Sequence, residues 1–360
     1  MVAKRTLTET NEATFSISNH RDTLNIGYVP MTDCATLIAA QEMGYFKEAG
    51  LDVNLSREAG WAGVRERMIH RELDGSHAHG SMIYEMACVA GRPSIPCVTG
   101  LMLSHNGSAI SFSNELWELG ARDARSMQRV ILELQGKRKF RFAVVLKFST
   151  QNYLLRKWLR TGGIDPDVDV EICVVPPTQV FTCLIQGHID GYCAGEPWSS
   201  IGLIRGVCWC AALTDEVDRM HPEKILLVSE AFAEHRHDEH VVMIAALIRA
   251  AKYCDKACNK SELAAILSQK KYFNTSAEAL LNALQGPFQR GMGMQSSAMD
   301  AIVFRRNNAC APTEEKARWI LGEINRNQLT PRPIELTGEQ VRSYFRMDIF
   351  DEAERSLVAA

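Results

Sequence analysis

Short runs that alternate between apolar and polar or small residues open the chain, and a helix-like pattern follows each of them. Leu24–Pro30 predicts a first strand, Thr32–Ala49 a helix that Gly50 ends, and Leu51–Leu55 a second strand. The next segments repeat this order, with helices predicted at Trp61–Arg71 and Ser81–Ala90 around a strand at Gly75–Gly80. This βαβαβα order is typical of the start of a doubly wound α/β sheet.

A second α/β set begins after the alternating segment Asn106–Ser113, which we interpret as a crossover into a second lobe. The segments around it give the following predictions: strands at Ile95–Met102, Phe140–Leu146, Val168–Val175 and Gly191–Gly195, helices at Ala121–Leu134 and Gln151–Thr161, a return strand at Glu223–Val228, and a mainly helical remainder over Glu239–Val358.

The two crossings predict three parts of the chain. They are a polar N-terminal tail (1–23), a lobe I formed by 24–105 and 215–360 with a helical C-terminal extension, and a lobe II formed by 106–214. Ligands of open α/β sheets bind at the carboxyl ends of the strands, so the expected binding site is a hinged cleft between the lobes.

Composition agrees with two globular lobes, because 46% of the 360 residues are hydrophobic and 23% are charged. The net charge of −3 gives no reason to expect binding to nucleic acid. No run is long and apolar enough for a membrane span, and Met1–Asp22 is polar without a signal-peptide core. We therefore predict a cytoplasmic protein with no membrane insertion.

Cysteine and histidine clusters raise the alternative of a metal site. The eleven cysteines cannot all pair, and most lie in apolar runs, which favours buried free thiols in a reducing compartment. Three groups have spacings compatible with metal ligands, but none has a matching set of further ligands: Cys254 with Cys258, His77 with His79, and His235, His237 and His240 in what we interpret as a charged surface loop. We predict no metal and no cofactor.

Several polar residues follow predicted strand ends and would line the cleft: Thr32-Asp33, Trp61, Ser108, Ser149–Asn152, Glu196 and Lys224. One cation, a helix N-terminus near Thr150 and neutral donors on Trp61, Ser108 and Gln151 suit a small monoanion. A diphosphate would call for a glycine-rich loop, and the chain contains neither a P-loop motif nor GxGxxG.

Each of these residues also has a structural interpretation that stays open. Trp61 could pack between the lobes without touching a ligand, and Lys224 could be a surface lysine at a strand edge. Glu196 could belong to a turn built by Glu196-Pro197-Trp198, and Thr32-Asp33 could cap the helix that follows.

Several segments together resemble a known family: GYVPMTDCATLIAAQEMGYFKEAGLDV, GWAGVRERM, NYLLRKWLRTGGIDPDVDVEICVVPP, GEPW and HPEK. The chain resembles the nitrate- and bicarbonate-binding receptors of ABC transporters from Leu24 to Cys258, and most of all the cytoplasmic nitrate/nitrite sensor of assimilation operons. The resemblance implies a type II periplasmic-binding-protein-like fold whose two lobes close on a ligand by a hinge.

The resemblance also implies roles for single residues. Trp61 matches the tryptophan that lines the anion pocket, and Lys224 matches the lysine that pairs with nitrate. Asn152 and Glu196 lie beside matched positions and would form part of the pocket wall.

Two positions depart from the family pattern. Ser108 stands where the nitrate receptor has a glutamine, and Gln151 stands where it has a histidine. Gln151 cannot titrate, so a histidine-type pH response would be lost, and the shorter Ser108 leaves more room. Nitrate or nitrite is the leading ligand on this resemblance, with a slightly larger planar anion or a carboxylate as the alternative.

Three functions follow as hypotheses. The first is a nitrate/nitrite sensor that controls an RNA-binding antiterminator of the ANTAR type, with no direct contact to nucleic acid. The second is a solute receptor of an ABC transporter for nitrate, bicarbonate or a related anion. The third is an enzyme on the same fold, with Cys34 at a helix start as the only tempting nucleophile; we predict that the protein is not an enzyme.

Overall fold

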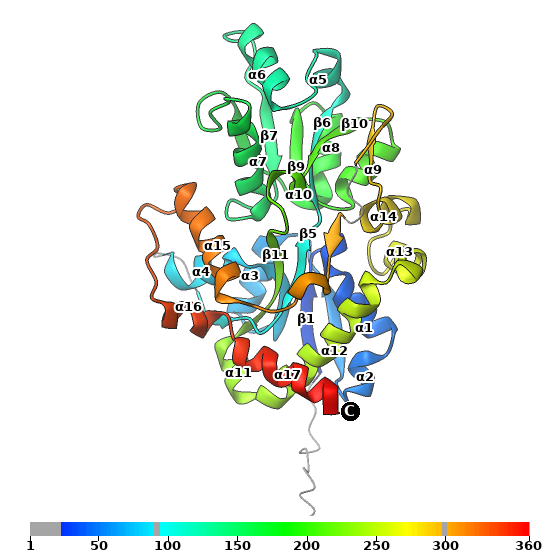
Figure 1. The fold of residues 1–360 in the computed structure, drawn as a ribbon, viewed down its shortest axis with the longest axis vertical. Helices are drawn as coiled ribbons and strands as arrows, with labels where there is room; N and C mark the ends of the chain where they lie inside the picture. The colour runs from blue at the N-terminus through cyan, green and yellow to red at the C-terminus, as the bar shows by residue number, and fades with distance from the viewer. Residues whose placement is uncertain (1–22, 90–93, 297–300, 360) are drawn as a thin grey trace, which may run out of the picture.

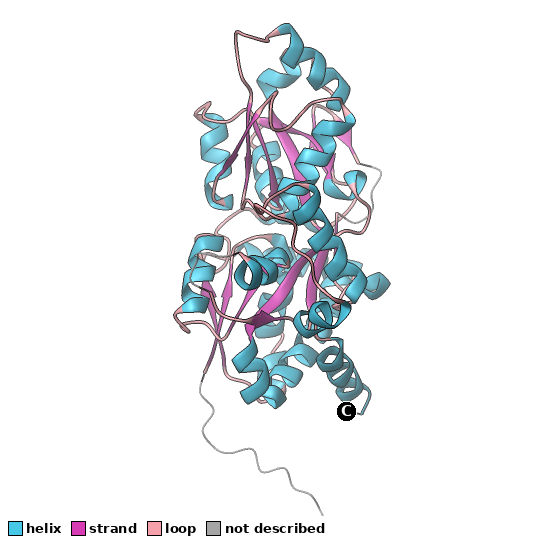
Figure 2. Cartoon of the chain, turned by 90° about the vertical axis from the view of Figure 1, so that its left-hand side faces the viewer, coloured by secondary structure: helices cyan, strands magenta, loops and turns pink. Residues whose placement is uncertain are grey.

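The computed structural model describes residues 23–89, 94–296 and 301–359, which form two α/β lobes stacked along the long axis of the molecule (Figure 1). Apart from Thr23, the predicted N-terminal tail lies outside these residues. The two lobes share the α/β architecture predicted from the sequence, and each is built on its own sheet (Figure 2).

The sheet of the lower lobe has the strand order β14-β5-β11-β3-β1-β2, and β4 pairs with β11. Strands β1, β2 and β3 are parallel, whereas β11 runs antiparallel to β3 and β5. The strands of this sheet are β1 (Leu24–Tyr28), β2 (Val53–Arg57), β3 (Gly75–His79), β4 (Cys97–Val98), β5 (Met102–Asn106), β11 (Pro222–Ser229) and β14 (Ile302–Val303).

The sheet of the upper lobe has the order β10-β6-β9-β7-β8. Strands β7, β8 and β9 are parallel, and β6 is antiparallel to β9 and β10. Its strands are β6 (Ser108–Ser113), β7 (Arg141–Val144), β8 (Glu171–Val174), β9 (Gly191–Gly195) and β10 (Cys208–Leu213). A separate hairpin, β12 (Gln289–Gly291) and β13 (Met294–Gln295), contacts β10.

Helices cover both sheets, as Figure 2 shows. Around the lower sheet lie α1 (Ala35–Glu42), α2 (Tyr45–Glu48), α3 (Trp61–Ile69), α4 (Ser81–Cys88), α11 (Glu230–His235), α12 (His237–Asp255), α13 (Lys260–Ser268), α14 (Ala277–Leu284), α15 (Glu314–Arg326), α16 (Gly338–Tyr344) and α17 (Met347–Ala359). Around the upper sheet lie α5 (Asn114–Glu118), α6 (Ala124–Glu133), α7 (Thr150–Thr161), α8 (Val180–Ile185) and α9 (Trp198–Ile204), and α10 (Thr214–Val217) follows β10.

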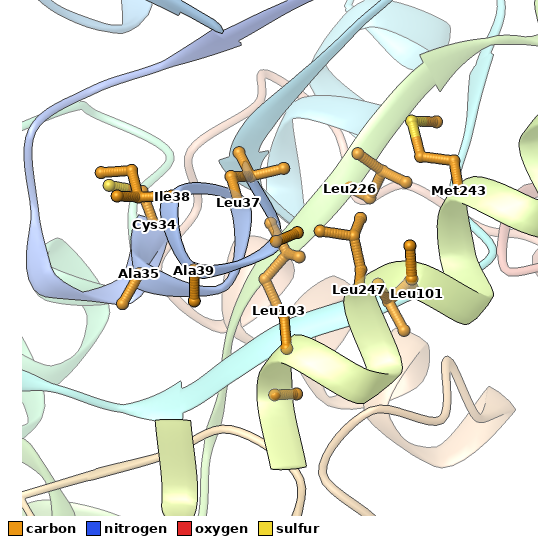
Figure 3. Close-up of a cluster of buried hydrophobic side chains, with 14 of the residues drawn as sticks. Cys34, Ala35, Leu37, Ile38, Ala39, Leu101, Leu103, Leu226, Met243 and Leu247 are labelled. Carbon is orange, nitrogen blue, oxygen red and sulfur yellow. The ribbon is translucent and has the colours of Figure 1, made fainter. Parts of the chain in front are cut away.

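The core of the lower lobe holds α1 in place. Apolar side chains of α1 and α12 pack against residues of β5 and β11 (Figure 3), and Leu37, Leu103, Leu226 and Leu247 are all buried. Full burial of a leucine side chain contributes about 1.5–3 kcal/mol. Because α1 is fixed in this way, the short 3-10 turn before it, Thr32–Cys34, has a defined position at the end of β1.

A second hydrophobic cluster crosses from one lobe to the other. It joins Met31 and Trp61 of the lower lobe to Tyr153 and Tyr192 of the upper lobe, and Ile320 of α15 belongs to it. The surfaces on which the lobes meet are therefore apolar around the polar residues described below.

Most predicted elements agree with the structure, and three predictions need correction. Thr32–Ala49 is not one helix, since Gly44 has a φ of 74° between α1 and α2. Ile95–Met102 is not one strand, because β4 and β5 each use only part of it. His235 ends α11 and His237 and His240 lie in α12, with Arg236 between the two helices, so this segment is not a loop. The remainder after 239 is mainly helical, as predicted, and it also contains the short strands β12, β13 and β14.

The end of α7 provides a test of packing within the upper lobe. A Cβ atom added at Gly162 would lie 2.2 Å from the carbonyl oxygen of Ala124, whereas one added at Gly322 in α15 would meet nothing within 4 Å. We expect Gly162→Ala to destabilise the protein by about 1–3 kcal/mol, because the neighbour is backbone. Gly322→Ala is the matched control and is expected to be neutral or stabilising by up to about 1 kcal/mol. Urea unfolding of both variants measures this, and equal midpoints would contradict the packing of α7 on α6.

Candidate functional site

Polar side chains from both lobes meet where the sheets face each other. In the lower lobe they follow β1, end β3 and begin β11, which runs antiparallel to β3 and so starts at the same edge. In the upper lobe they follow β9, begin β6 and begin α7. The site therefore lies at the carboxyl ends of the parallel strands, where open α/β sheets bind ligands.

Lys224 is the central cation of the site and is fully buried. Its Nζ forms an ion pair with Oδ2 of Asp33 at 2.7 Å and donates to Oε1 of Glu223 at 2.6 Å. Burial lowers the pKa of Lys224, but the two carboxylates outweigh burial, and its pKa lies above the ordinary value. The lysine is therefore charged, and its charge is compensated within the protein.

Asp33 holds the next group of the cluster. Its Oδ1 accepts a hydrogen bond from Nε2 of His77 at 2.7 Å. Burial raises the pKa of Asp33, but Lys224 and His77 outweigh burial and hold it well below the usual range. Burial lowers the pKa values of both His77 and His79, so that both rings are neutral.

Trp61 forms a wall of the site at the start of α3. Its ring centroid lies 4.5 Å from that of His79 and 5.3 Å from that of His77, and Nζ of Lys224 lies 5.6 Å from the Trp61 ring centroid. Its Nε1 is buried and has no hydrogen-bond partner among the described residues. A buried N–H without a partner costs about 1–3 kcal/mol, so this donor is available to a ligand.

Ser108 and Gln151 link the upper lobe to this cluster. Nε2 of Gln151 donates to Oγ of Ser108 at 2.7 Å and to Oε1 of Glu223 at 2.9 Å. The second bond crosses between the lobes. Within the described chain Oε1 of Gln151 has no partner. The sequence analysis assigned Gln151 as a donor for an anion, whereas both of its N–H groups are directed at protein atoms here.

The side chain of Asn152 forms its hydrogen bonds with residues outside this cluster. Its Nδ2 donates to the carbonyl of Lys147 at 2.7 Å, and its Oδ1 accepts from Nε of Arg156 at 3.2 Å. The side chain therefore serves the start of α7, and its assignment to the pocket wall has no support in these contacts.

Glu196 lies beside the cluster at the end of β9. Its carbonyl accepts from the backbone N–H of Thr32 at 2.6 Å, which ties the lobes together, and its Oε2 accepts from the N–H of Ser200 at 3.1 Å. Burial raises the pKa of Glu196 to about 7, although the bonds from Ser200 oppose the rise. This carboxyl is poised to change charge near neutral pH.

The structure thus brings together Trp61, Ser108, Gln151 and Lys224, with Glu196 next to them. Asp33, which the sequence analysis placed at the cleft or as a helix cap, also belongs to the cluster. Three further members were not assigned to the cleft: His77 and His79, which were considered as metal ligands, and Glu223. Among residues 23–89, 94–296 and 301–359, no group of three histidine, cysteine or acidic side chains has the geometry of a metal site.

Cys34 does not have the environment of a nucleophile. Burial raises its pKa well above the ordinary value, and the charge of Asp33 adds to the rise. Its side chain belongs to the apolar cluster of Figure 3. The expectation that a helix start lowers the pKa of this thiol is wrong, because desolvation dominates.

The NMT1-like family matches residues 18–268. The nitrate import ATP-binding protein NrtC of Synechocystis sp. is 31% identical over 340 residues, covering 93% of this chain and 50% of that protein. The bicarbonate-binding protein CmpA of Synechococcus sp. is 30% identical over 352 residues, covering 93% of this chain and 78% of that protein. The chain spans about half the length of NrtC and of the similar CmpC proteins.

A solved structure agrees with these relatives. The periplasmic nitrate-binding protein NrtA from Synechocystis PCC 6803 superposes with a TM-score of 0.88 at 26% identity, covering 94% of this chain and 89% of the other. The fold is therefore that of the periplasmic-binding-protein-like α/β class, as predicted. The chain belongs to the NMT1-like family and is a homologue of the nitrate- and bicarbonate-binding proteins. No described helix has the length and apolar character of a membrane span.

The charge of Glu196 predicts a dependence of stability on pH. Because its pKa is raised to about 7 in the folded protein, the stability that it contributes is fully present below about pH 4.5 and is lost as the pH rises through about 7. Glu196→Gln is expected to remove this loss, which is up to about 3 kcal/mol at pH 8. Urea unfolding of wild type and variant at about pH 5 and pH 8 measures it. Parallel pH profiles would show that Glu196 does not titrate in this range.

Proposed function

We propose that this protein is a solute receptor that encloses a small planar oxyanion of the nitrate or bicarbonate type between its lobes. The carrying observation is the charged Lys224, fully buried where the lobes meet and surrounded by polar atoms of both lobes. The unpartnered Nε1–H of Trp61 and the amide of Gln151 support an exchange of hydrogen bonds with a small polar ligand.

The names of the relatives favour a receptor over an enzyme. CmpA is named as a bicarbonate-binding protein, and NrtA of Nostoc sp., which is 27% identical, as a nitrate/nitrite binding protein. Cys34 was the candidate nucleophile in the sequence, and its raised pKa does not favour the reactive thiolate. Binding with release of the unchanged ligand is the function that these observations support best.

Whether the receptor serves a transporter or a regulator is the finer question. Relatives named for import and transport favour a role with an ABC transporter. Control of an ANTAR-type antiterminator by nitrate or nitrite in the cytoplasm stays a prediction from the resemblance. In either role, a ligand changes the affinity for a partner only by its different affinities for the two arrangements of the lobes.

A calorimetric titration tests the proposal with nitrate, nitrite, bicarbonate and formate as probes. We expect wild type to bind at least one of them, and Lys224→Met to lose at least about tenfold in affinity, because a hydrogen bond to a charged group contributes about 1.5–3 kcal/mol. Lys271→Met is the matched control, since Lys271 forms an ion pair with Glu42 on the surface.

Loss of Lys224 leaves Asp33 and Glu223 without their cation, so this variant could unfold. Trp61→Phe therefore accompanies it, since it removes the unpartnered N–H and keeps most of the ring. A weaker ligand affinity is expected for this variant with an unchanged circular dichroism spectrum. Absence of binding by folded wild type to all four anions would refute the proposed function.

A further inference from the structure

We propose that this site selects an oxyanion that carries its own proton, so that bicarbonate binds in preference to nitrate, and that Glu223 sets the preference. The inference rests on the proposed function, because it concerns the ligand class of the same site. Nitrate and bicarbonate are both small, planar monoanions. Nitrate offers only hydrogen-bond acceptors, whereas bicarbonate also has one O–H donor, so a site can separate the two ions through the acceptors that it presents.

Glu223 fixes the direction of the Gln151 amide. Oε1 of Glu223 accepts from Nε2 of Gln151 at 2.9 Å and from Nζ of Lys224 at 2.6 Å. Reversal of the amide would place the carbonyl oxygen of Gln151 against a carboxylate oxygen that already accepts from Lys224, so two acceptors would face each other. The NH₂ group therefore stays on Glu223 and Ser108, and Oε1 of Gln151 stays a buried acceptor without a described partner.

His77 presents a second acceptor from the opposite lobe. Its Nε2 is bonded to Oδ1 of Asp33, so the proton of the neutral ring lies on Nε2 and Nδ1 has a free lone pair. Nδ1 is buried without a hydrogen-bond partner in the described part of the chain. An anion that only accepts leaves both this nitrogen and the Gln151 carbonyl unsatisfied, whereas a ligand O–H can satisfy one of them.

The charge balance of the cluster acts in the same direction. Two carboxylates, Asp33 and Glu223, surround the single ammonium of Lys224 at 2.7 and 2.6 Å. Within this cluster the ammonium of Lys224 is already paired with two carboxylates, and the neutral rings of His77 and His79 add no positive charge. A ligand that donates a proton toward an acceptor offsets part of this repulsion, and nitrate cannot do so.

Titration of the full chain with bicarbonate and nitrate in sealed cells at about pH 8 tests the inference. We expect wild type to bind bicarbonate at least about tenfold more tightly than nitrate. Glu223→Gln removes one negative charge and lets the Gln151 amide reverse, so the ratio is expected to fall at least about tenfold, mainly because nitrate binds more tightly. Glu323→Gln is the matched control, since Glu323 is also a buried carboxyl but lies on α15 beside Arg326.

Gln151→Met provides a second variant that keeps both charges of Glu223 and Lys224. It removes the acceptor without adding a charge, so bicarbonate affinity should fall about tenfold while nitrate affinity stays within about twofold. This outcome does not depend on whether Glu223→Gln folds.

The results separate the inference from the proposed function. Wild type that binds nitrate as tightly as bicarbonate overturns the selectivity and leaves the receptor function standing. An unchanged ratio in a folded Glu223→Gln variant, or equal losses for both ions in Gln151→Met, overturns the role given to these residues. Wild type that binds neither of these ions, nor nitrite or formate, overturns the selectivity and the receptor function together.

Discussion

The ammonium of Lys224 between the carboxylates of Asp33 and Glu223 is the interaction on which the site depends. Burial of a charge costs several kcal/mol unless partners compensate it, and here two partners lie at 2.6–2.7 Å. Removal of Lys224 would leave the two carboxylates uncompensated in the interior. Burial is the main reason why the pKa values of the neighbouring histidines are lowered, and the charge of Lys224 acts in the same direction.

The apolar architecture gives these charged groups their positions. Lys224 belongs to β11, which has neighbours on both sides in the lower sheet, and it pairs in register with His79 of β3. Asp33 precedes α1, whose apolar side chains pack against α12 and the sheet (Figure 3). Neither group needs a mobile loop to reach the other. The hydrophobic packing of the lower lobe thus fixes an ion pair before any contact with the upper lobe is made.

Much of the fold was predictable because apolar periodicity is local. The order of strands and helices from Leu24 to Ser113 follows from alternation and glycine positions, and the resemblance singled out Trp61 and Lys224. The partners of Lys224 were not predictable in this way. Glu223 and Lys224 are sequence neighbours at the start of β11, where the pairing with β5 is irregular, so strand alternation does not predict that their side chains meet. From the sequence, Asp33 could equally be a cap of the helix that follows it. Its hydrogen bond with His77 joins residues that are 44 positions apart. Such pairings depend on the order in which the strands lie in the sheet, and no local sequence pattern gives that order.

Two hydrogen bonds between the lobes involve residues next to the ion pair. Oε1 of Glu223 accepts from Gln151 of the upper lobe, and the carbonyl of Glu196 accepts from the N–H of Thr32 of the lower lobe. Glu223 is adjacent to Lys224, and Thr32 is adjacent to Asp33. The residues that hold the ion pair therefore lie next to the residues that connect the two lobes. A ligand that reorganises the Gln151 amide would alter the first bond directly. Its chemistry, and not only its size, would then decide whether this contact between the lobes is kept.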